Sequence, residues 1–295
     1  MKKCVFEGCA TALVTPMLPD GSVNVPGLQR VVEQQIAGGI DALVVCGTTG
    51  ESATLNHEEH TKVIETAVKQ ANGRIPIIAG TGSNDTNYAV HLSKEAVALG
   101  AAALLMVTPY YNKTSQAGLV AHYHYIADRV DAPIILYNVP SRTGVNIKPE
   151  TYRELAKHPN IVATKEANGD LSALLKTVSL CGDELNVYSG NDDQTVPIMS
   201  IGGKGVISVL SNILPGEMHR IADLCLKGDF KTATALCVKY AALMDDMFMD
   251  VNPIPVKDAM NLMGMEVGPC RLPLVKLSDA NLEKLREEMR RQGIL

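Results

Sequence analysis

A lysine follows a short apolar run, where its amine would be suited to act as a nucleophile. Residues 161–164 are Ile, Val, Ala and Thr, a pattern typical of a buried strand, and Lys165 comes next. At the end of a buried strand the ammonium loses hydration, which lowers its pKa and favours a neutral amine able to form a Schiff base with a ketone. The alternative is a structural lysine paired with the adjacent Glu166.

A loop of glycine and threonine is suited to hold a carboxylate. Residues 47–50 are Gly-Thr-Thr-Gly, directly after another apolar run. The glycines let backbone N–H groups turn towards a ligand, and the hydroxyl groups of Thr48 and Thr49 add donors. Considered alone, the same four residues are equally compatible with a plain tight turn.

Two more side chains with suitable chemistry, Tyr137 and Arg142, lie at the end of a third apolar run. The Tyr137 hydroxyl can donate and accept a hydrogen bond, so beside a Schiff-base lysine it is able to move protons. Arg142 stays charged, and its planar guanidinium matches a carboxylate with two parallel hydrogen bonds. A core tyrosine and a solvated loop arginine are the alternatives for each residue on its own.

Apolar runs that alternate with helical segments are expected to position these side chains. Strands that are apolar throughout and alternate with helices form a parallel sheet covered by helices, and eight such units are enough to close a barrel. The sequence therefore predicts an α/β fold, a (β/α)8 TIM barrel over residues 1–228 with a C-terminal helical extension over residues 229–295. The predicted strands are 9–14, 41–46, 75–79, 102–107, 133–137, 161–164, 185–188 and 205–209, the barrel helices are 26–37, 57–71, 87–99, 116–129, 149–157, 171–180, 194–200 and 216–226, and the extension helices are 229–248, 255–263 and 278–291.

The polar groups follow the carboxyl ends of the predicted strands, where TIM barrels carry their active sites. An open doubly wound sheet would use the same alternation, but its nucleotide-binding glycine fingerprint does not follow the first strand, where residues 15–17 are Thr-Pro-Met. The glycines at 80 and 82 lack a third glycine at the required spacing. The sequence therefore argues against a nicotinamide oxidoreductase.

Composition excludes several classes of partner. The chain has 295 residues, a formal net charge of −5, no Trp and no basic tract, which argues against nucleic acid binding. Its longest apolar stretches, such as residues 101–107, are far shorter than the ~20 residues of a membrane-spanning helix. The seven cysteines are scattered without a Cys-x-x-Cys pair, and a secretory signal is not visible, so we expect a cytoplasmic protein.

Two histidine pairs lack the spacing of a metal site. His57 and His60 are three residues apart rather than four, and Asn56 with Glu59 has the pattern of a helix N-cap and its capping-box partner. The pair at positions 122 and 124 lies on a mostly polar segment without a third ligand in sequence. The sequence predicts no metal.

Four spaced motifs closely resemble the dihydrodipicolinate synthase family, also called the 4-hydroxy-tetrahydrodipicolinate synthases. They are residues 47–52 (GTTGES), 108–112 (TPYYN), 137–144 (YNVPSRTG) and 165–167 (KEA), and the likeness runs from about Phe6 to the C-terminus. The resemblance implies the condensation of pyruvate with aspartate semialdehyde, which opens diaminopimelate and lysine biosynthesis. It implies no metal or organic cofactor, because the Schiff-base lysine supplies the electron sink.

The family pattern implies a proton relay and an oligomer. Lys165 would form the Schiff base with pyruvate, and Tyr137, Thr48 and Tyr111 match the relay. In the family the tyrosine at the Tyr111 position enters the site from a neighbouring subunit. The resemblance thus implies a homo-oligomer, at least a dimer and commonly a tetramer built as a dimer of dimers.

The same pattern implies the substrate contacts. Arg142 would hold the carboxylate of the semialdehyde and steady Tyr137. The loop of Thr48 and Thr49 would hold the carboxylate of pyruvate. Positions Gly190 and Ile207 match residues that line the pocket in the family.

Many members of the family are inhibited by lysine at the dimer interface, and this chain keeps part of that site. Tyr88 stands where lysine-sensitive members carry a glutamate that faces the amino groups of the ligand. Loss of one charge-assisted hydrogen bond costs about 1.5–3 kcal/mol, so we expect weakened or absent inhibition. The candidate positions are Ala53, Leu55, His57, His60, Asn84, Tyr88 and Tyr110.

Two other functions remain open on sequence alone. N-acetylneuraminate lyase and the 2-keto-3-deoxy-sugar-acid aldolases share the lysine, the tyrosine and the glycine-threonine loop, and a shared fold does not fix the substrate. Arg142 and Tyr111, in their sequence contexts, argue against these aldolases. A catalytically silent barrel that binds a ligand as a regulator is the second alternative.

Overall fold

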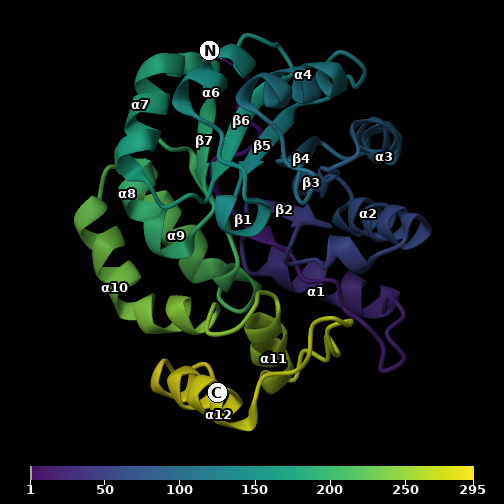
Figure 1. Ribbon diagram of the computed structural model, residues 1–295. Helices are drawn as coiled ribbons and strands as arrows, with labels where there is room; N and C mark the ends of the chain where they lie inside the picture. Colours follow the sequence, from purple (N-terminus) through teal and green to yellow (C-terminus); the bar gives the residue numbers. More distant parts are fainter. Residues whose placement is uncertain (1) are drawn as a thin grey trace.

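The computed structural model describes residues 2–295 and confirms the predicted barrel (Figure 1). Eight parallel strands close in sequence order, and the last pairs with the first. Each strand lies within two residues of its predicted bounds at either end. The strands are β1 (Gly8–Ala12), β2 (Ala42–Val45), β3 (Ile77–Gly80), β4 (Ala103–Val107), β5 (Ile134–Asn138), β6 (Ile161–Glu166), β7 (Asn186–Ser189) and β8 (Gly205–Ser208).

The predicted helices are also confirmed, and they cover the outside of the barrel (Figure 1). They are α1 (Val25–Ala37), α2 (His57–Ala71), α3 (Thr86–Ala98), α4 (Gln116–Ala127), α6 (Pro149–Leu155), α7 (Leu171–Cys181), α8 (Thr195–Ser200) and α9 (Pro215–Leu226). The extension contains α10 (Phe230–Asp246), α11 (Ile254–Leu262) and α12 (Asp279–Arg291). Sequence analysis missed α5 (Pro140–Thr143) and four short 3-10 turns, η1 (Ser52–Thr54), η2 (Gly182–Glu184), η3 (Asp192–Gln194) and η4 (Leu210–Asn212).

The beginning of α2 has the capping box that its sequence predicts. The Asn56 side chain accepts a hydrogen bond from the Glu59 backbone N–H at 2.9 Å, and the Glu59 carboxylate accepts one from the Asn56 backbone N–H at 3.0 Å. These bonds satisfy backbone donors that the first helical turn leaves free. Within residues 2–295, no helix is long and apolar enough to span a membrane.

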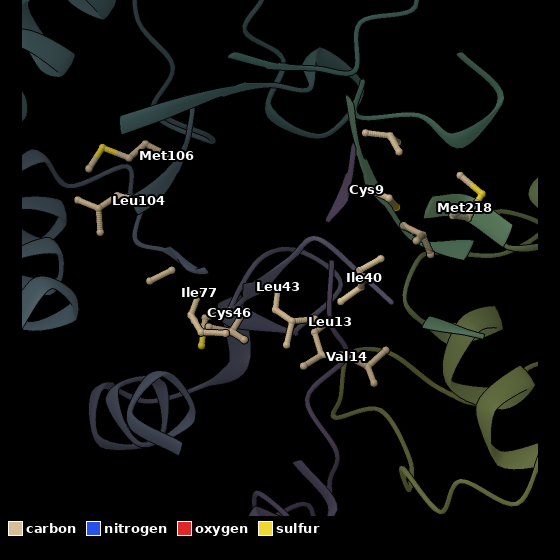
Figure 2. Close-up of a cluster of buried hydrophobic side chains, with 14 of the residues drawn as sticks. Cys9, Leu13, Val14, Ile40, Leu43, Cys46, Ile77, Leu104, Met106 and Met218 are labelled. Carbon is tan, nitrogen blue, oxygen red and sulfur yellow. The ribbon is translucent and has the colours of Figure 1, made fainter. Parts of the chain in front are cut away.

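The strands are apolar on both faces because each face packs against a different core. One core lies between the sheet and the helices and contains Leu43, Leu104 and Met106 (Figure 2). The other fills the barrel interior. At its amino end the interior is closed by Phe6 and Tyr188, whose rings stack with centroids 4.3 Å apart. The interior is therefore open to substrate only at the carboxyl ends of the strands.

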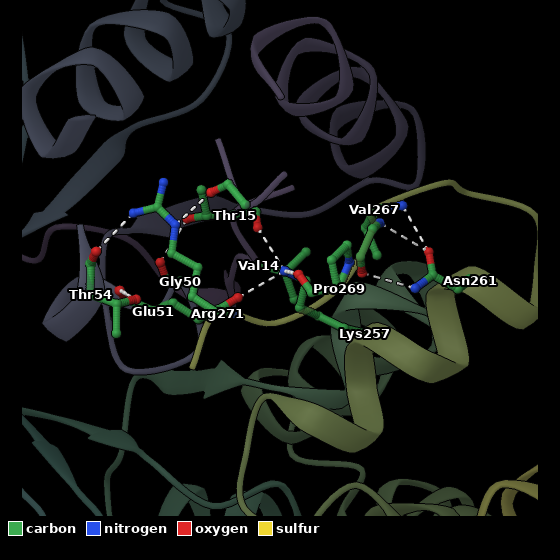
Figure 3. A network of polar contacts seen from close by, with 12 residues as sticks. Val14, Thr15, Gly50, Glu51, Thr54, Lys257, Asn261, Val267, Pro269 and Arg271 are labelled. Carbon is green, nitrogen blue, oxygen red and sulfur yellow. Dashed lines mark hydrogen bonds and ion pairs between the residues drawn. The ribbon is translucent and has the colours of Figure 1, made fainter. Parts of the chain in front are cut away.

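The C-terminal extension is joined to the loop after β2 by a buried ion pair (Figure 3). Lys257 on α11 donates to Glu51 Oε1 at 2.8 Å and to two backbone carbonyls, and both charged side chains are only 1% exposed. The backbone N–H of Arg271 donates to Glu51 Oε2 at 2.8 Å. Since Glu51 directly follows residues 47–50, these contacts fix the carboxyl end of that loop.

We predict that Lys257→Met lowers the free energy of unfolding by about 3–5 kcal/mol, because it leaves the Glu51 carboxylate buried without its cation. Urea denaturation followed by circular dichroism measures the change. The control is Lys62→Met, because Lys62 forms an ion pair with Glu65 while its side chain is 55% exposed. An exposed pair contributes little to stability. Equal losses in the two variants would contradict the structural role of Lys257.

Candidate active site

Lys165 and Tyr137 face each other inside the barrel. They are register partners on β6 and β5, and the Lys165 Nζ atom lies 4.4 Å from the centroid of the Tyr137 ring. Lys165 is 5% exposed, and this burial lowers its pKa to about 8, while the Asp192 charge raises the pKa and the Arg142 charge lowers it. About a tenth of the Lys165 amine is therefore uncharged at pH 7, far more than for a lysine with the ordinary pKa.

Glu166 is not the partner of Lys165. Adjacent residues of a strand point to opposite faces of the sheet, and the Glu166 carboxylate accepts hydrogen bonds from Asn138 at 2.9 Å and from the Tyr152 hydroxyl at 2.9 Å. Burial raises the pKa of Glu166 to about 7, although these hydrogen bonds act in the other direction. The structure thus excludes the structural lysine–glutamate pair considered from sequence.

The Tyr137 hydroxyl is connected to Thr48 and influenced by Arg142. Burial is the largest influence on Tyr137 and raises its pKa, whereas the Arg142 charge and a hydrogen bond with the Thr48 side chain lower it. The phenol keeps its proton near neutral pH and remains able to donate it. Tyr137 is 7% exposed, so the phenol and the amine share an interior shielded from bulk solvent.

The loop at residues 47–50 is tightly turned, but the left-handed backbone lies beside its glycines rather than at them. Cys46 has φ 53° and Glu51 has φ 55°. Gly50 is required for a different reason, since a Cβ atom there would lie 3.1 Å from the Leu13 carbonyl oxygen. A Cβ at Gly47 would meet only a Val44 methyl at 3.6 Å. The sequence argument, that these two glycines give the backbone conformational freedom, therefore applies to neither: Gly50 is needed for space, and Gly47 is not.

Asn252, from the segment between α10 and α11, contacts two sides of the site. Its side-chain amide donates to Thr49 Oγ1 at 3.0 Å, and its backbone carbonyl oxygen accepts from the Arg142 guanidinium at 3.5 Å. Sequence analysis assigned no role to this residue. Its place within the stretch from about Phe6 to the C-terminus that resembles the family was the only signal that pointed to it.

Asp192 is a second residue to which sequence analysis assigned no role. It lies in η3 after β7, is 3% exposed, and accepts hydrogen bonds from the backbone N–H groups of Val209 and Leu210 at 3.1 and 2.9 Å. Burial raises its pKa, while hydrogen bonds and the Lys165 charge lower it. The Asp192 charge raises the pKa of Lys165 and so favours the charged form of the amine. An acidic residue just after a predicted buried strand was the available signal.

A cavity of about 470 Å³ lies at the mouth of the barrel. Thr48 and Arg142 line it together with part of the C-terminal segment, including Asn252. Five of the candidate lysine-site residues, Ala53, Leu55, His60, Tyr88 and Tyr110, line the same cavity. The cavity thus joins most of the candidate lysine-site residues to Thr48 and Arg142 of the predicted active site.

The other two candidate lysine-site residues, His57 and Asn84, are outside the lining of this cavity. His57 Nδ1 lies 3.3 Å from the Tyr88 hydroxyl, so it contacts a lining residue without lining the cavity itself. The Asn84 side chain donates to the Tyr110 carbonyl oxygen at 3.2 Å. Each of these two residues therefore contacts a residue that lines the cavity.

Gly190 and Ile207 also lie outside the cavity lining, and Gly190 is half-buried directly after β7. The Gly190 backbone N–H donates to the Glu166 carbonyl oxygen at 2.7 Å, and a Cβ atom there would lie 2.8 Å from the Ala167 Cβ. Ile207 is fully buried on β8 among the interior residues. Gly190 thus lets the ends of β6 and β7 approach closely.

Tyr111 does not enter the site of its own chain. It is 93% exposed and has φ 68°, whereas the adjacent Tyr110 lines the cavity. The structure brings together Lys165, Tyr137, Thr48 and Arg142, whereas the Tyr111 side chain is almost fully exposed.

The chain is similar to known proteins along nearly its full length. The profile of the dihydrodipicolinate synthetase family matches residues 5–292. The 4-hydroxy-tetrahydrodipicolinate synthase of Thermoanaerobacter sp. is 51% identical over 292 residues, which cover 99% of this chain and 98% of that protein.

Solved structures are similar throughout the chain. The dihydrodipicolinate synthase of Acinetobacter baumannii, complexed with pyruvate, has a TM-score of 0.96 at 45% identity and covers 98% of this chain and 99% of its own. The enzyme of Cyanidioschyzon merolae with lysine bound has a TM-score of 0.96 at 38% identity and covers 99% of this chain and 100% of its own. With its barrel, its buried amine and this similarity along nearly its full length, the chain belongs to the dihydrodipicolinate synthetase family.

Proposed function

We propose that this chain condenses pyruvate with L-aspartate 4-semialdehyde, the reaction of the 4-hydroxy-tetrahydrodipicolinate synthases, in lysine and diaminopimelate biosynthesis. The observation that carries the proposal is the buried Lys165 amine, with its pKa lowered to about 8, beside Tyr137. Relatives of this name at 51% identity support the choice of substrates. The biosynthetic role and the seven free cysteines support a location in the cytoplasm.

The covalent chemistry starts at the Lys165 nitrogen. The neutral amine attacks the ketone carbon of pyruvate, and loss of water from the resulting carbinolamine gives an iminium. The positive iminium accepts the electron pair released when the methyl group of pyruvate loses a proton, which gives an enamine. The enamine carbon then attacks the aldehyde carbon of the semialdehyde, and the new alkoxide takes up a proton. Finally, the amino group of the semialdehyde attacks the iminium carbon, closes the ring and releases Lys165.

Several of these steps need proton transfer, which Tyr137 is placed to perform. Its phenol lies beside Lys165 and keeps its proton near neutral pH because burial raises its pKa. The hydrogen bond with Thr48 connects it to the mouth of the barrel, where the cavity begins. We assign Tyr137 and Thr48 to the transfer of protons between the reacting carbons and the cavity.

The carboxylates of the two substrates require separate contacts. The loop of Thr48 and Thr49, held by Asn252 and by the buried Glu51, is assigned to pyruvate. Arg142 at the cavity wall is assigned to the semialdehyde, since its guanidinium is able to bind a carboxylate through two hydrogen bonds. N-acetylneuraminate lyase chemistry would use the same lysine and tyrosine, so a coupled assay with aspartate semialdehyde against one with sialic acid distinguishes the two functions.

The assembly belongs to the same proposal. The exposed Tyr111 side chain supports donation of its hydroxyl to the site of a neighbouring subunit, and hence a homo-oligomer of at least two chains. A tetramer, built as a dimer of dimers, is the form that we propose on the basis of the family resemblance.

We predict that pyruvate with cyanoborohydride adds a stable mass to Lys165. Because the Lys165 pKa is lowered to about 8, the reactive neutral fraction increases about tenfold per pH unit below pH 8 and levels off above it. Mass spectrometry of intact protein at several pH values gives the rate, and peptide mapping locates the adduct. The internal control is Lys257, a buried lysine held in an ion pair, which remains unmodified. An unmodified Lys165 would favour a silent ligand-binding barrel.

We predict that Tyr111→Phe lowers kcat by about 10²–10⁴-fold, the usual contribution of a proton-transfer group. Lys165→Ala is inactive because it lacks the nucleophile. If Tyr111 acts across a dimer, co-expression of the two variants creates one intact site in each mixed dimer and restores about a quarter of the wild-type activity. Activity that stays at the level of the separate variants would show that Tyr111 does not act in the partner's site.

We predict that millimolar lysine inhibits this chain weakly or not at all, since Tyr88 offers a neutral phenol in place of a carboxylate. Burial raises the pKa of Tyr88 and keeps the phenol neutral. The variant Tyr88→Glu is expected to bind lysine about 10- to 100-fold more tightly, which corresponds to one charge-assisted hydrogen bond. Activity assays with increasing lysine compare the two proteins. Strong inhibition of the unaltered chain would refute this prediction.

A further inference from the structure

Three potential metal ligands meet on the outer surface of the barrel, outside the proposed active site. His57 is the first residue of α2, and His91 and Glu95 lie one helical turn apart on α3, which packs against α2 (Figure 1). Their ligand atoms all lie within 4.8 Å of one another, and among residues 2–295 this is the only group of His, Cys, Asp or Glu residues with that arrangement. We call these three residues the α2–α3 cluster.

The distances within the α2–α3 cluster are close to those of a metal site. His57 Nε2 lies 2.9 Å from Glu95 Oε2, and His91 Nε2 lies 3.6 Å from Glu95 Oε1. Two ligands of a tetrahedral zinc ion, each at about 2.0–2.2 Å from the metal, are roughly 3.3 Å apart. Small side-chain rotations therefore bring all three ligands to one ion without a change in the backbone.

The hydrogen bonds of the cluster leave an acceptor without a well-aligned donor. Glu95 Oε2 is shielded from solvent and accepts no hydrogen bond from any of the residues 2–295, despite its short distance to His57. The two imidazole rings stack with centroids 5.2 Å apart, so they present their nitrogen atoms to the same carboxylate. A cation between the rings and the carboxylate would use this buried oxygen.

The sequence pair His57 and His60 does not form this site. His60 Nε2 lies 2.8 Å from the Gly80 carbonyl oxygen on the inner side of α2, and burial lowers the His60 pKa. His57 is directed instead towards α3. The three ligands are thus supplied by two helices, α2 and α3. A sequence pattern that looks for closely spaced histidines in one segment does not find them.

We infer that His57, His91 and Glu95 form a binding site for a divalent transition-metal ion of the zinc class. Two imidazoles with one carboxylate suit Zn²⁺ or Co²⁺, whereas Mg²⁺ and Ca²⁺ favour sites made of oxygen ligands. The side chains of His57, His91 and Glu95 are 37%, 60% and 37% exposed, so an ion has access and a water molecule is able to take the fourth position. The bound ion joins the beginning of α2 to the middle of α3.

The position of the site gives the ion a connection to the cavity wall. His57 Nδ1 lies 3.3 Å from the hydroxyl of Tyr88, which lines the cavity. An ion on His57 fixes the ring that contacts this phenol. The site itself does not depend on the proposed reaction, because none of its three ligands contacts Lys165 or lines the cavity.

The experiment measures binding of Zn²⁺ to the metal-free full-length protein. Isothermal titration with zinc chloride is expected to give one ion per chain, and Co²⁺ is expected to give visible absorption bands typical of low coordination number. Zn²⁺ at saturation is expected to raise Tm by several degrees, since it binds only the folded chain. Removal of one ligand, in His91→Ala or Glu95→Gln, is expected to weaken binding at least tenfold, and both residues are exposed enough for the variants to fold.

The matched control is His124→Ala. His124 lies on α4 beside His158, whose Nε2 atom is 3.1 Å from Asp128 Oδ1, so this group also has two histidines and one carboxylate but lacks the convergence of ligand atoms. We expect His124→Ala to bind Zn²⁺ as the unaltered chain does. Absence of Zn²⁺ binding at millimolar concentration, or binding that survives in both His91→Ala and Glu95→Gln, would overturn the inference.

Discussion

The Lys165 amine lies in the interior of a closed sheet, where water cannot stabilise its charged form. The resulting desolvation lowers its pKa to about 8, and the neighbouring Asp192 and Arg142 adjust that value in opposite directions. The remaining site depends on this state, since a fully charged ammonium is not a nucleophile. Closure of the barrel at its amino end by Phe6 and Tyr188 keeps solvent from reaching the amine from below.

The C-terminal extension fixes the position of the loop of Thr48 and Thr49. The Glu51–Lys257 ion pair and Asn252 hold the loop of Thr48 and Thr49 in a fixed orientation towards the barrel axis. Such buried polar contacts are costly unless every partner is satisfied. Here, the Lys257 ammonium has three acceptors, which matches its three donors. The extension therefore completes the site and does more than cover the barrel.

Local pattern was enough to predict the strands and helices, because each unit carries its own hydrophobic period and its own end signals. The placement of Lys165, Tyr137 and Arg142 at strand ends followed from the same pattern. The hydrophobic pattern could not predict the backbone conformation of the loops. The left-handed backbone at Cys46 and Glu51 has no composition signal of its own, since neither residue is a glycine.

Contacts between distant segments were equally hidden. Asp192 and Asn252 influence the site because packing brings distant parts of the chain together. The spacing of residues within one motif cannot predict such contacts. The direction of Tyr111 depends on a positive φ in a loop. His57 was compared with the histidine next to it in sequence, whereas its neighbours in space are on α3.

The link between Lys257 on α11 and the loop after β2 also bears on protein synthesis, because Glu51 and Lys257 are 206 residues apart in the chain. During synthesis, Glu51 emerges from the ribosome long before Lys257, which neutralises its charge. The barrel also cannot close until β8 pairs with β1. Contacts of such long range form late in folding. The nascent chain thus carries an incomplete and inactive catalytic centre until its last segment has emerged.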